Sequence, residues 1–164
     1  CCRFDESDAR ALGRTASGVR GINIEENDEV VGMITYDPTA EDAAAHSILV
    51  VSENGYGKRS DFDEYRKTNR GGKGVKTLNI TEKTGALVAM KNVTDENDLM
   101  IINKSGLTIR MAVSDIRVAG RATQGVKLIN IKEGDSIAAI SAVNKSEEET
   151  PVQPAEQVNE ENNE

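Results

Sequence analysis

The strongest constraint on the fold is an internal repeat. One eleven-residue pattern occurs three times without a gap, as RTASGVRGINI at 14–24, RGGKGVKTLNI at 70–80 and RATQGVKLINI at 121–131. The period is therefore about 50 residues, which is in the range of propeller blades and other stacked repeats. In such arrays each unit buries its faces against its neighbours, so we expect a repeat architecture in place of one continuous core.

The residues inside each copy predict β-structure. Apolar and β-branched residues are separated by polar ones and bounded by Gly, Asn and Asp, and no helical periodicity is present. Each copy continues through a polar turn into an apolar segment, at 30–34, 87–90 and 137–140. A further apolar segment, at 48–51 and 99–102, precedes the second and third copies, and the first copy lacks it. We predict an all-β, propeller-like partial array of about three four-stranded blades.

The chain divides into five predicted parts. The tail holds one Lys, seven Glu and two of the three prolines, a composition that cannot bury a core, so we expect it to be disordered. Because the chain opens directly on a strand-like segment without Met, we expect it to be part of a longer protein. The predicted parts are an incomplete first blade (1–36), a connecting loop (37–46), a second blade (47–95), a third blade (96–144) and the acidic tail (145–164).

Several classes of function find no support in these residues. The apolar runs 48–51 and 99–102 are far shorter than the about 20 residues of a membrane span, and no signal peptide opens the chain, so we expect a cytoplasmic protein. Cys1 and Cys2 are adjacent, and His46 is the only histidine, so neither a disulfide nor a metal site is indicated. No nucleophile, base and orienting group can be assembled, so we expect no enzymatic activity and no cofactor here.

The most specific segment is TNRGGKG at 68–74. Glycine lets the main chain approach a phosphate closely, and Arg70 and Lys73 can neutralise its charge. No Ser or Thr follows the lysine, so this is not a nucleotide-binding loop. Residues 56–76 hold seven basic and three acidic residues in a chain of formal net charge −8, which favours contact with a polyanion.

This segment resembles the box of DNA gyrase A subunits, whose pattern is Gln-Arg/Lys-Arg-Gly-Gly-Arg/Lys-Gly. The match covers 70–74, whereas Thr68 and Asn69 depart from the pattern. The Gly-Val-Arg/Lys repeats and the acidic tail extend the resemblance to essentially the whole chain, which is similar to the C-terminal domain of that family. The matching residues are Arg70, Gly71, Gly72, Lys73 and Gly74.

The resemblance implies a β-pinwheel of up to six blades that wraps duplex DNA and so supports negative supercoiling. It also implies that the rest of the gyrase A subunit is a partner, together with the gyrase B subunit, and that ATP and Mg are used by other parts of the enzyme. The family's nucleophilic tyrosine lies outside this region, and none of Tyr36, Tyr56 or Tyr65 has its sequence context.

The box and the repeat register together give the candidate DNA contacts. The basic residues at equivalent positions in the repeats could instead brace turns by bonding to carbonyl groups, and this alternative stays open. Two other functions also stay open: the C-terminal domain of the topoisomerase IV A subunit, and a propeller-like scaffold that binds proteins. The candidates are Arg70, Lys73, Gly71, Gly72, Gly74, Arg59, Lys58, Lys76, Arg20, Lys127, Arg110, Arg121 and Arg14.

Overall fold

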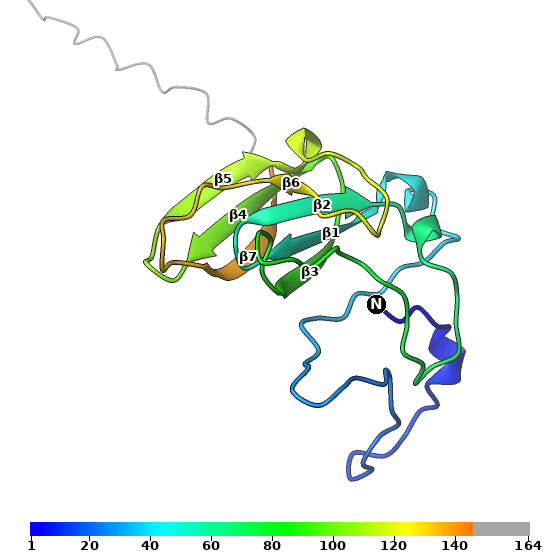
Figure 1. The fold of residues 1–164 in the computed structure, drawn as a ribbon. Helices are drawn as coiled ribbons and strands as arrows, with labels where there is room; N and C mark the ends of the chain where they lie inside the picture. Colours follow the sequence, from blue (N-terminus) through cyan, green and yellow to red (C-terminus); the bar gives the residue numbers. More distant parts are fainter. Residues whose placement is uncertain (146–164) are drawn as a thin grey trace, which may run out of the picture.

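The computed structural model describes residues 1–145, and the strands within them form two antiparallel sheets (Figure 1). The predicted tail, 145–164, lies outside the described residues except for Lys145. The connections carry short 3-10 helices rather than α-helices, so the predicted all-β class is confirmed. These are η1 (Glu6–Asp8), η2 (Ala43–Ala45), η3 (Phe62–Glu64) and η4 (Val113–Asp115).

The first sheet has the strand order β3-β1-β2-β6. Its central strand β1 (Ser47–Ser52) pairs with β2 (Tyr56–Ser60) on one side and β3 (Leu87–Val93) on the other. The fourth strand, β6 (Val126–Lys127), comes from the third repeat and pairs with β2. Three strands of this sheet lie in the predicted range 47–95, and the fourth lies in the range 96–144.

The second sheet repeats the same arrangement with one strand fewer among the described residues. Its order is β5-β4-β7, with β4 (Asn97–Asn103) in the centre between β5 (Thr108–Ala112) and β7 (Ile137–Asn144). The repeat register makes β4 equivalent to β1, β5 to β2 and β7 to β3. The apolar segments predicted as strands at 48–51, 87–90, 99–102 and 137–140 are all strands in the structure.

The core explains why β1 is apolar without alternation. Leu49 and Val51 belong to one buried cluster with residues of the second sheet, whereas Ile48 and Val50 belong to another with Phe62. A strand covered on both faces has no reason to alternate apolar with polar residues. The two clusters therefore join the first sheet to the second sheet on one face and to the first repeat on the other.

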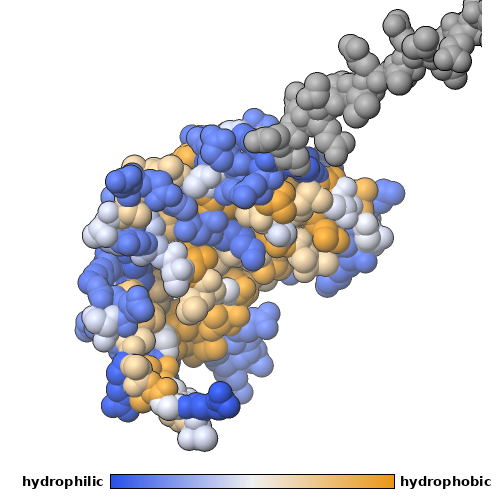
Figure 2. Space-filling view, turned by 180° about the vertical axis from the view of Figure 1, so that it is seen from behind, coloured by the Kyte–Doolittle hydropathy of each residue, from blue (hydrophilic) through white to orange (hydrophobic). Residues whose placement is uncertain are grey.

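The first repeat differs from the other two because residues 1–46 contain no named strand. The apolar segment 30–34 was expected to be a strand, yet Val30 is 61% and Met33 84% exposed. The equivalent segment of the second repeat is β3, which pairs with β1, whereas residues 30–34 pair with no strand among the described residues. Gly32, next to Met33, lies against the side chain of Met90 on β3, and apolar side chains gather toward the middle of the face in Figure 2.

Candidate nucleic-acid interface

Three equivalent segments concentrate the positive charge. Residues 10–20, 66–76 and 117–127 hold eleven of the chain's 20 Lys and Arg and not one Asp or Glu. We call these the basic segments, and together the basic arc. They follow η1, η3 and η4 in turn and are coloured blue, green and yellow in Figure 1. Their cations are Arg10, Arg14, Arg20, Arg66, Lys67, Arg70, Lys73, Lys76, Arg117, Arg121 and Lys127.

Backbone hydrogen bonds join each basic segment to the next. Just beyond the first segment, the Asn23 N–H donates to the carbonyl of Gly72 at 2.9 Å. At the equivalent place one repeat later, the Asn79 N–H donates to the carbonyl of Thr123 at 3.1 Å. Because this bond is repeated, each basic segment is fixed relative to the next. The arc is therefore one ordered surface and not a set of independent loops.

The last glycine of the box also serves this contact between repeats. Gly74 has a φ of +76°, and a Cβ at this position would collide with the backbone of Cys1. Gly125 has a φ of +78° and would collide in the same way with Gly57. Only glycine combines the left-handed backbone with so close an approach. The expected reason for this glycine was approach to a phosphate, and the structure adds a second one, approach to the neighbouring repeat.

Most cations of the arc are exposed. Nine of the eleven are exposed, among them the predicted Arg14, Arg20, Lys73, Lys76 and Lys127. The two half-buried ones are Arg70 and Arg121, and both use their guanidinium groups to bond carbonyls of the preceding repeat. The structure therefore brings seven of the predicted basic contacts into one series of segments.

One carboxylate competes for a cation of the arc. Lys67 Nζ lies 2.6 Å from Asp5 Oδ2. The hydrogen bond from Lys67, with those from Ser7, holds the pKa of Asp5 well below its usual range. Asp5 therefore stays ionised at neutral pH and neutralises Lys67 in the free protein.

Lys58 lies inside the protein, although the sequence placed it among the DNA contacts. It is fully buried, and its Nζ donates to the carbonyl of Gly120 at 2.6 Å. Burial lowers the pKa of Lys58 to about 8, and Glu64 opposes this shift. Its ammonium group thus joins the second repeat to the third and does not reach the surface.

Arg59 and Arg110 occupy equivalent positions on β2 and β5 but lie in different surroundings. Arg59 is 7% exposed and bonds the carbonyl of Ile116 and the carboxylate of Asp95. Arg110 is more open, and its Nε donates to Asp98 Oδ2 at 2.6 Å. Neither belongs to the basic arc. Arg59 is buried against the third repeat and therefore joins two repeats. The sequence alone does not show this burial.

The structure adds cations that were not among the candidates. Arg10, Arg66, Lys67 and Arg117 are exposed members of the arc. The shared register of Arg10, Arg66 and Arg117 was visible in the sequence and could have included them.

Beyond the arc, Lys83 and Lys132 lie, together with Lys127 of the arc, around Tyr56. The Nζ atoms of Lys83 and Lys127 lie 5.4 Å and 6.0 Å from the centre of its ring. A shallow hollow of about 250 Å³ adjoins this ring and includes Lys132. Neither Lys83 nor Lys132 repeats in the register, so no sequence signal pointed to them.

Residues 1–145 hold neither a candidate metal site nor a candidate membrane span. No group of three or more His, Cys, Asp and Glu side chains is placed to hold a metal ion there. No helix in this part of the chain is long and apolar enough to cross a lipid bilayer. The expected absence of a cofactor stays a prediction.

Comparison with known proteins gives a family and several relatives. The family described as DNA gyrase C-terminal domain, beta-propeller, matches residues 3–37, 46–94 and 97–144. The DNA gyrase A subunit of Staphylococcus epidermidis is 48% identical over 146 residues, and that of Staphylococcus aureus is 47% identical over 147 residues. These matches cover 89% and 90% of this chain but 16% of each relative, so the chain spans about a sixth of their length.

Two solved structures share the fold. The C-terminal domain of DNA gyrase A superposes with a TM-score of 0.74 over 85% of this chain and 45% of that chain, at 24% identity. The C-terminal domain of DNA topoisomerase IV superposes with a TM-score of 0.75 over 86% of this chain and 42% of that chain, also at 24% identity. The same architecture thus occurs in both kinds of protein.

Proposed function

Since this chain belongs to the DNA gyrase C-terminal domain family, we propose that it binds duplex DNA along the basic arc, without sequence preference, and bends it. One observation carries the proposal: three equivalent segments hold eleven cations and no acid, and backbone hydrogen bonds join them in series. A series of cations held in place by these bonds can contact successive phosphates of a duplex, and such contacts carry affinity without reading bases.

The energetics require many contacts. Bending a short duplex by 40–90° costs roughly 1–6 kcal/mol, so no single ionic contact can hold the bend. Nine exposed cations in the arc are enough to share that cost. Six to ten phosphate contacts would make the affinity fall on the order of 10³–10⁵-fold between about 50 and 200 mM salt.

The wider role is that of the named relatives. We propose that the chain acts in the cytoplasm as the C-terminal part of a bacterial DNA gyrase A subunit. Its partners would be the remainder of that polypeptide and the gyrase B subunit. The bound and bent DNA would support negative supercoiling, while strand breakage, ATP and Mg belong to other parts of the enzyme. The candidate residues on the arc contribute binding and no catalytic step.

Two alternative functions, a topoisomerase IV domain and a protein-binding scaffold, are each favoured by one observation. The topoisomerase IV domain shares the fold as closely as the gyrase domain does, so topology alone does not separate them. Val30, Met33 and Ile80 are large apolar side chains that are more than half exposed, which favours a protein-binding surface. The basic arc distinguishes DNA binding from the second alternative because a protein-binding scaffold needs no acid-free series of cations.

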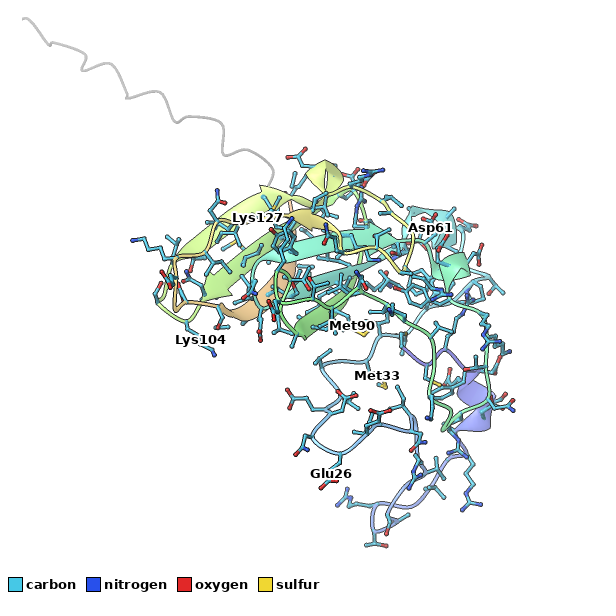
Figure 3. All side chains as sticks on the ribbon, in the orientation of Figure 1. Glu26, Met33, Asp61, Met90, Lys104 and Lys127 are labelled. Carbon is cyan, nitrogen blue, oxygen red and sulfur yellow. The ribbon has the colours of Figure 1, made fainter. Side chains whose placement is uncertain are left out.

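The test is the salt dependence of duplex binding. Affinity of the 164-residue chain for a duplex of random sequence is measured by fluorescence anisotropy at several salt concentrations. We expect a steep slope that Lys73→Ala with Lys76→Ala reduces by about 0.9 per lysine. Lys91→Ala with Lys104→Ala is the matched control, because both lysines lie outside the arc and Lys104 lies at the far end of the second sheet (Figure 3). A flat slope, or an equal effect of the two pairs, contradicts the proposal.

A further inference from the structure

Two arginines of the arc make the same bond one repeat apart. Arg70 Nη1 donates to the carbonyl of Arg20 at 2.5 Å, and Arg121 Nη1 donates to the carbonyl of Lys76 at 3.0 Å. Arg70 and Arg121 are equivalent in the register, and so are Arg20 and Lys76. The bond therefore belongs to the repeat and is not an accident of one loop.

A second bond of each arginine reaches an equivalent position, although it uses different groups in the two repeats. Arg70 Nε donates to the carbonyl of Asp8 at 2.9 Å, and the Arg121 backbone N–H donates to the carboxylate of Glu64 at 3.3 Å. Asp8 and Glu64 are again equivalent positions. Each arginine is thus held by the end of the 3-10 helix and by the end of the basic segment that precede it.

We propose that Arg70 and Arg121 are positioning residues, which set the spacing of the DNA-contacting cations and hence the curvature of bound DNA. This inference rests on the proposed function. Each guanidinium group clamps the main chain of a residue that presents a cation of the preceding basic segment, because the accepting carbonyls belong to Arg20 and Lys76 themselves. Both of those side chains are exposed, whereas both clamping arginines are half-buried.

The roles in the box then separate by geometry. Lys73 is exposed and contacts phosphate, while Arg70 orders the surface on which the phosphate lies. A guanidinium can reach two carbonyls at once through Nε and Nη1, which an ammonium on a single stem cannot do in the same geometry. Arg70→Lys therefore keeps the charge and loses the clamp, and it separates the two roles.

The first measurement uses the free protein. Amide hydrogen exchange is followed by NMR for the Gly71 N–H, which donates to the carbonyl of Gly21 at 2.9 Å, and for the Asn23 N–H. We expect Arg70→Lys and Arg70→Ala to speed exchange at both amides about tenfold or more, which corresponds to about 1.4 kcal/mol. Lys73→Ala is the control and leaves both rates unchanged. Unchanged rates in Arg70→Lys overturn the clamp whether or not the protein binds DNA.

The second measurement is DNA bending. Energy transfer between the ends of a duplex of about 30 base pairs reports the bend in saturated complexes. We expect Arg70→Lys to lose as much transfer as Arg70→Ala, and Lys104→Ala, a change outside the arc, to keep the wild-type transfer. Wild-type transfer in Arg70→Lys overturns the inference, since charge alone would then suffice.

Two controls complete the design. Denaturant midpoints identify a variant that does not fold, and Arg121→Lys then replaces Arg70→Lys, with exchange read at the Asn79 N–H and bending measured as before. If the wild-type chain binds no duplex, the proposed function and the effect on DNA curvature both fail, whereas the amide exchange still decides whether the clamp exists.

Discussion

Arg59 Nε donates to the carbonyl of Ile116 at 2.8 Å, and this bond ties β2 of the second repeat to the chain just after η4 of the third. The equivalent bond one repeat earlier runs from Arg3 Nη1 to the carbonyl of Tyr65 at 3.0 Å. Guanidinium groups therefore join repeats in both directions, forward from Arg3 and Arg59 and backward from Arg70 and Arg121.

The first prediction concerns stability. Arg59→Ala removes the donor from a buried carbonyl, so we expect it to lower the free energy of unfolding by about 2–3 kcal/mol. Arg117→Ala is the control, because Arg117 is exposed and we expect a change within about 0.5 kcal/mol. Urea denaturation measures both. Equal stability of the two variants would mean that Arg59 does not join the repeats.

The second prediction is a pH dependence from Lys58. Burial lowers the pKa of Lys58 in the folded state to about 8, whereas the unfolded chain keeps a value of about 10.4. Between these values the unfolded state binds more protons, so the Lys58 contribution makes the free energy of unfolding rise with pH. Below pH 8 both states are protonated and this contribution is constant. Denaturation curves from pH 7 to 11 should show the rise in the wild type relative to Lys58→Met, and parallel curves would contradict it.

The third prediction concerns the carboxylate that competes with DNA. Asp5→Asn releases Lys67 from its ion pair, so we expect tighter duplex binding and a salt slope steeper by about 0.9. Asp61→Asn makes the same charge change without an ion pair to the arc, and Figure 3 shows its position beside η3. If both variants gain affinity equally, net charge and not Lys67 is responsible.

The fourth prediction concerns glycine. Gly134 has a φ of +82° and open space where a Cβ would stand, so Gly134→Ala should cost only the strain of the left-handed backbone, about 1 kcal/mol. Gly125 adds a collision with the backbone of Gly57, so Gly125→Ala should cost at least about twice as much. Thermal unfolding of the two variants provides the comparison. A cost at Gly125 no larger than at Gly134 would show that the repeats are not packed this closely.

Much of the fold followed from the repeat. The aligned copies located the strands at 48–51, 87–90, 99–102 and 137–140 because short apolar segments bounded by turns form strands when neighbours cover them. The register also aligned cations, and the structure brings those at 14, 70 and 121 and at 20, 76 and 127 into one series. Equivalent sequence positions occupy equivalent places in an array, so the sequence alone was enough to predict these strands and the alignment of these cations.

The pairing of strands from different repeats could not be predicted from the sequence in the same way. β6 pairs with β2, and this pairing depends on how consecutive repeats lie in space. Lys58 and Arg59 are predicted DNA contacts because both lie in the basic stretch 56–76 and Arg59 also lies in the repeat register of Arg3 and Arg110. They are adjacent in β2, and both are buried because the first sheet is covered on both faces. Successive side chains of a strand point to opposite faces, so covering even one face of a sheet turns one of two adjacent residues inward. That observation was available in the sequence and identifies the kind of position that needs a structural explanation.

The pairing of β6 with β2 has a consequence for how the molecule comes apart. The third repeat supplies the edge strand of the first sheet, so unfolding of either repeat breaks the hydrogen bonds between β6 and β2. Loss of order should therefore spread along the array as a single cooperative transition rather than blade by blade.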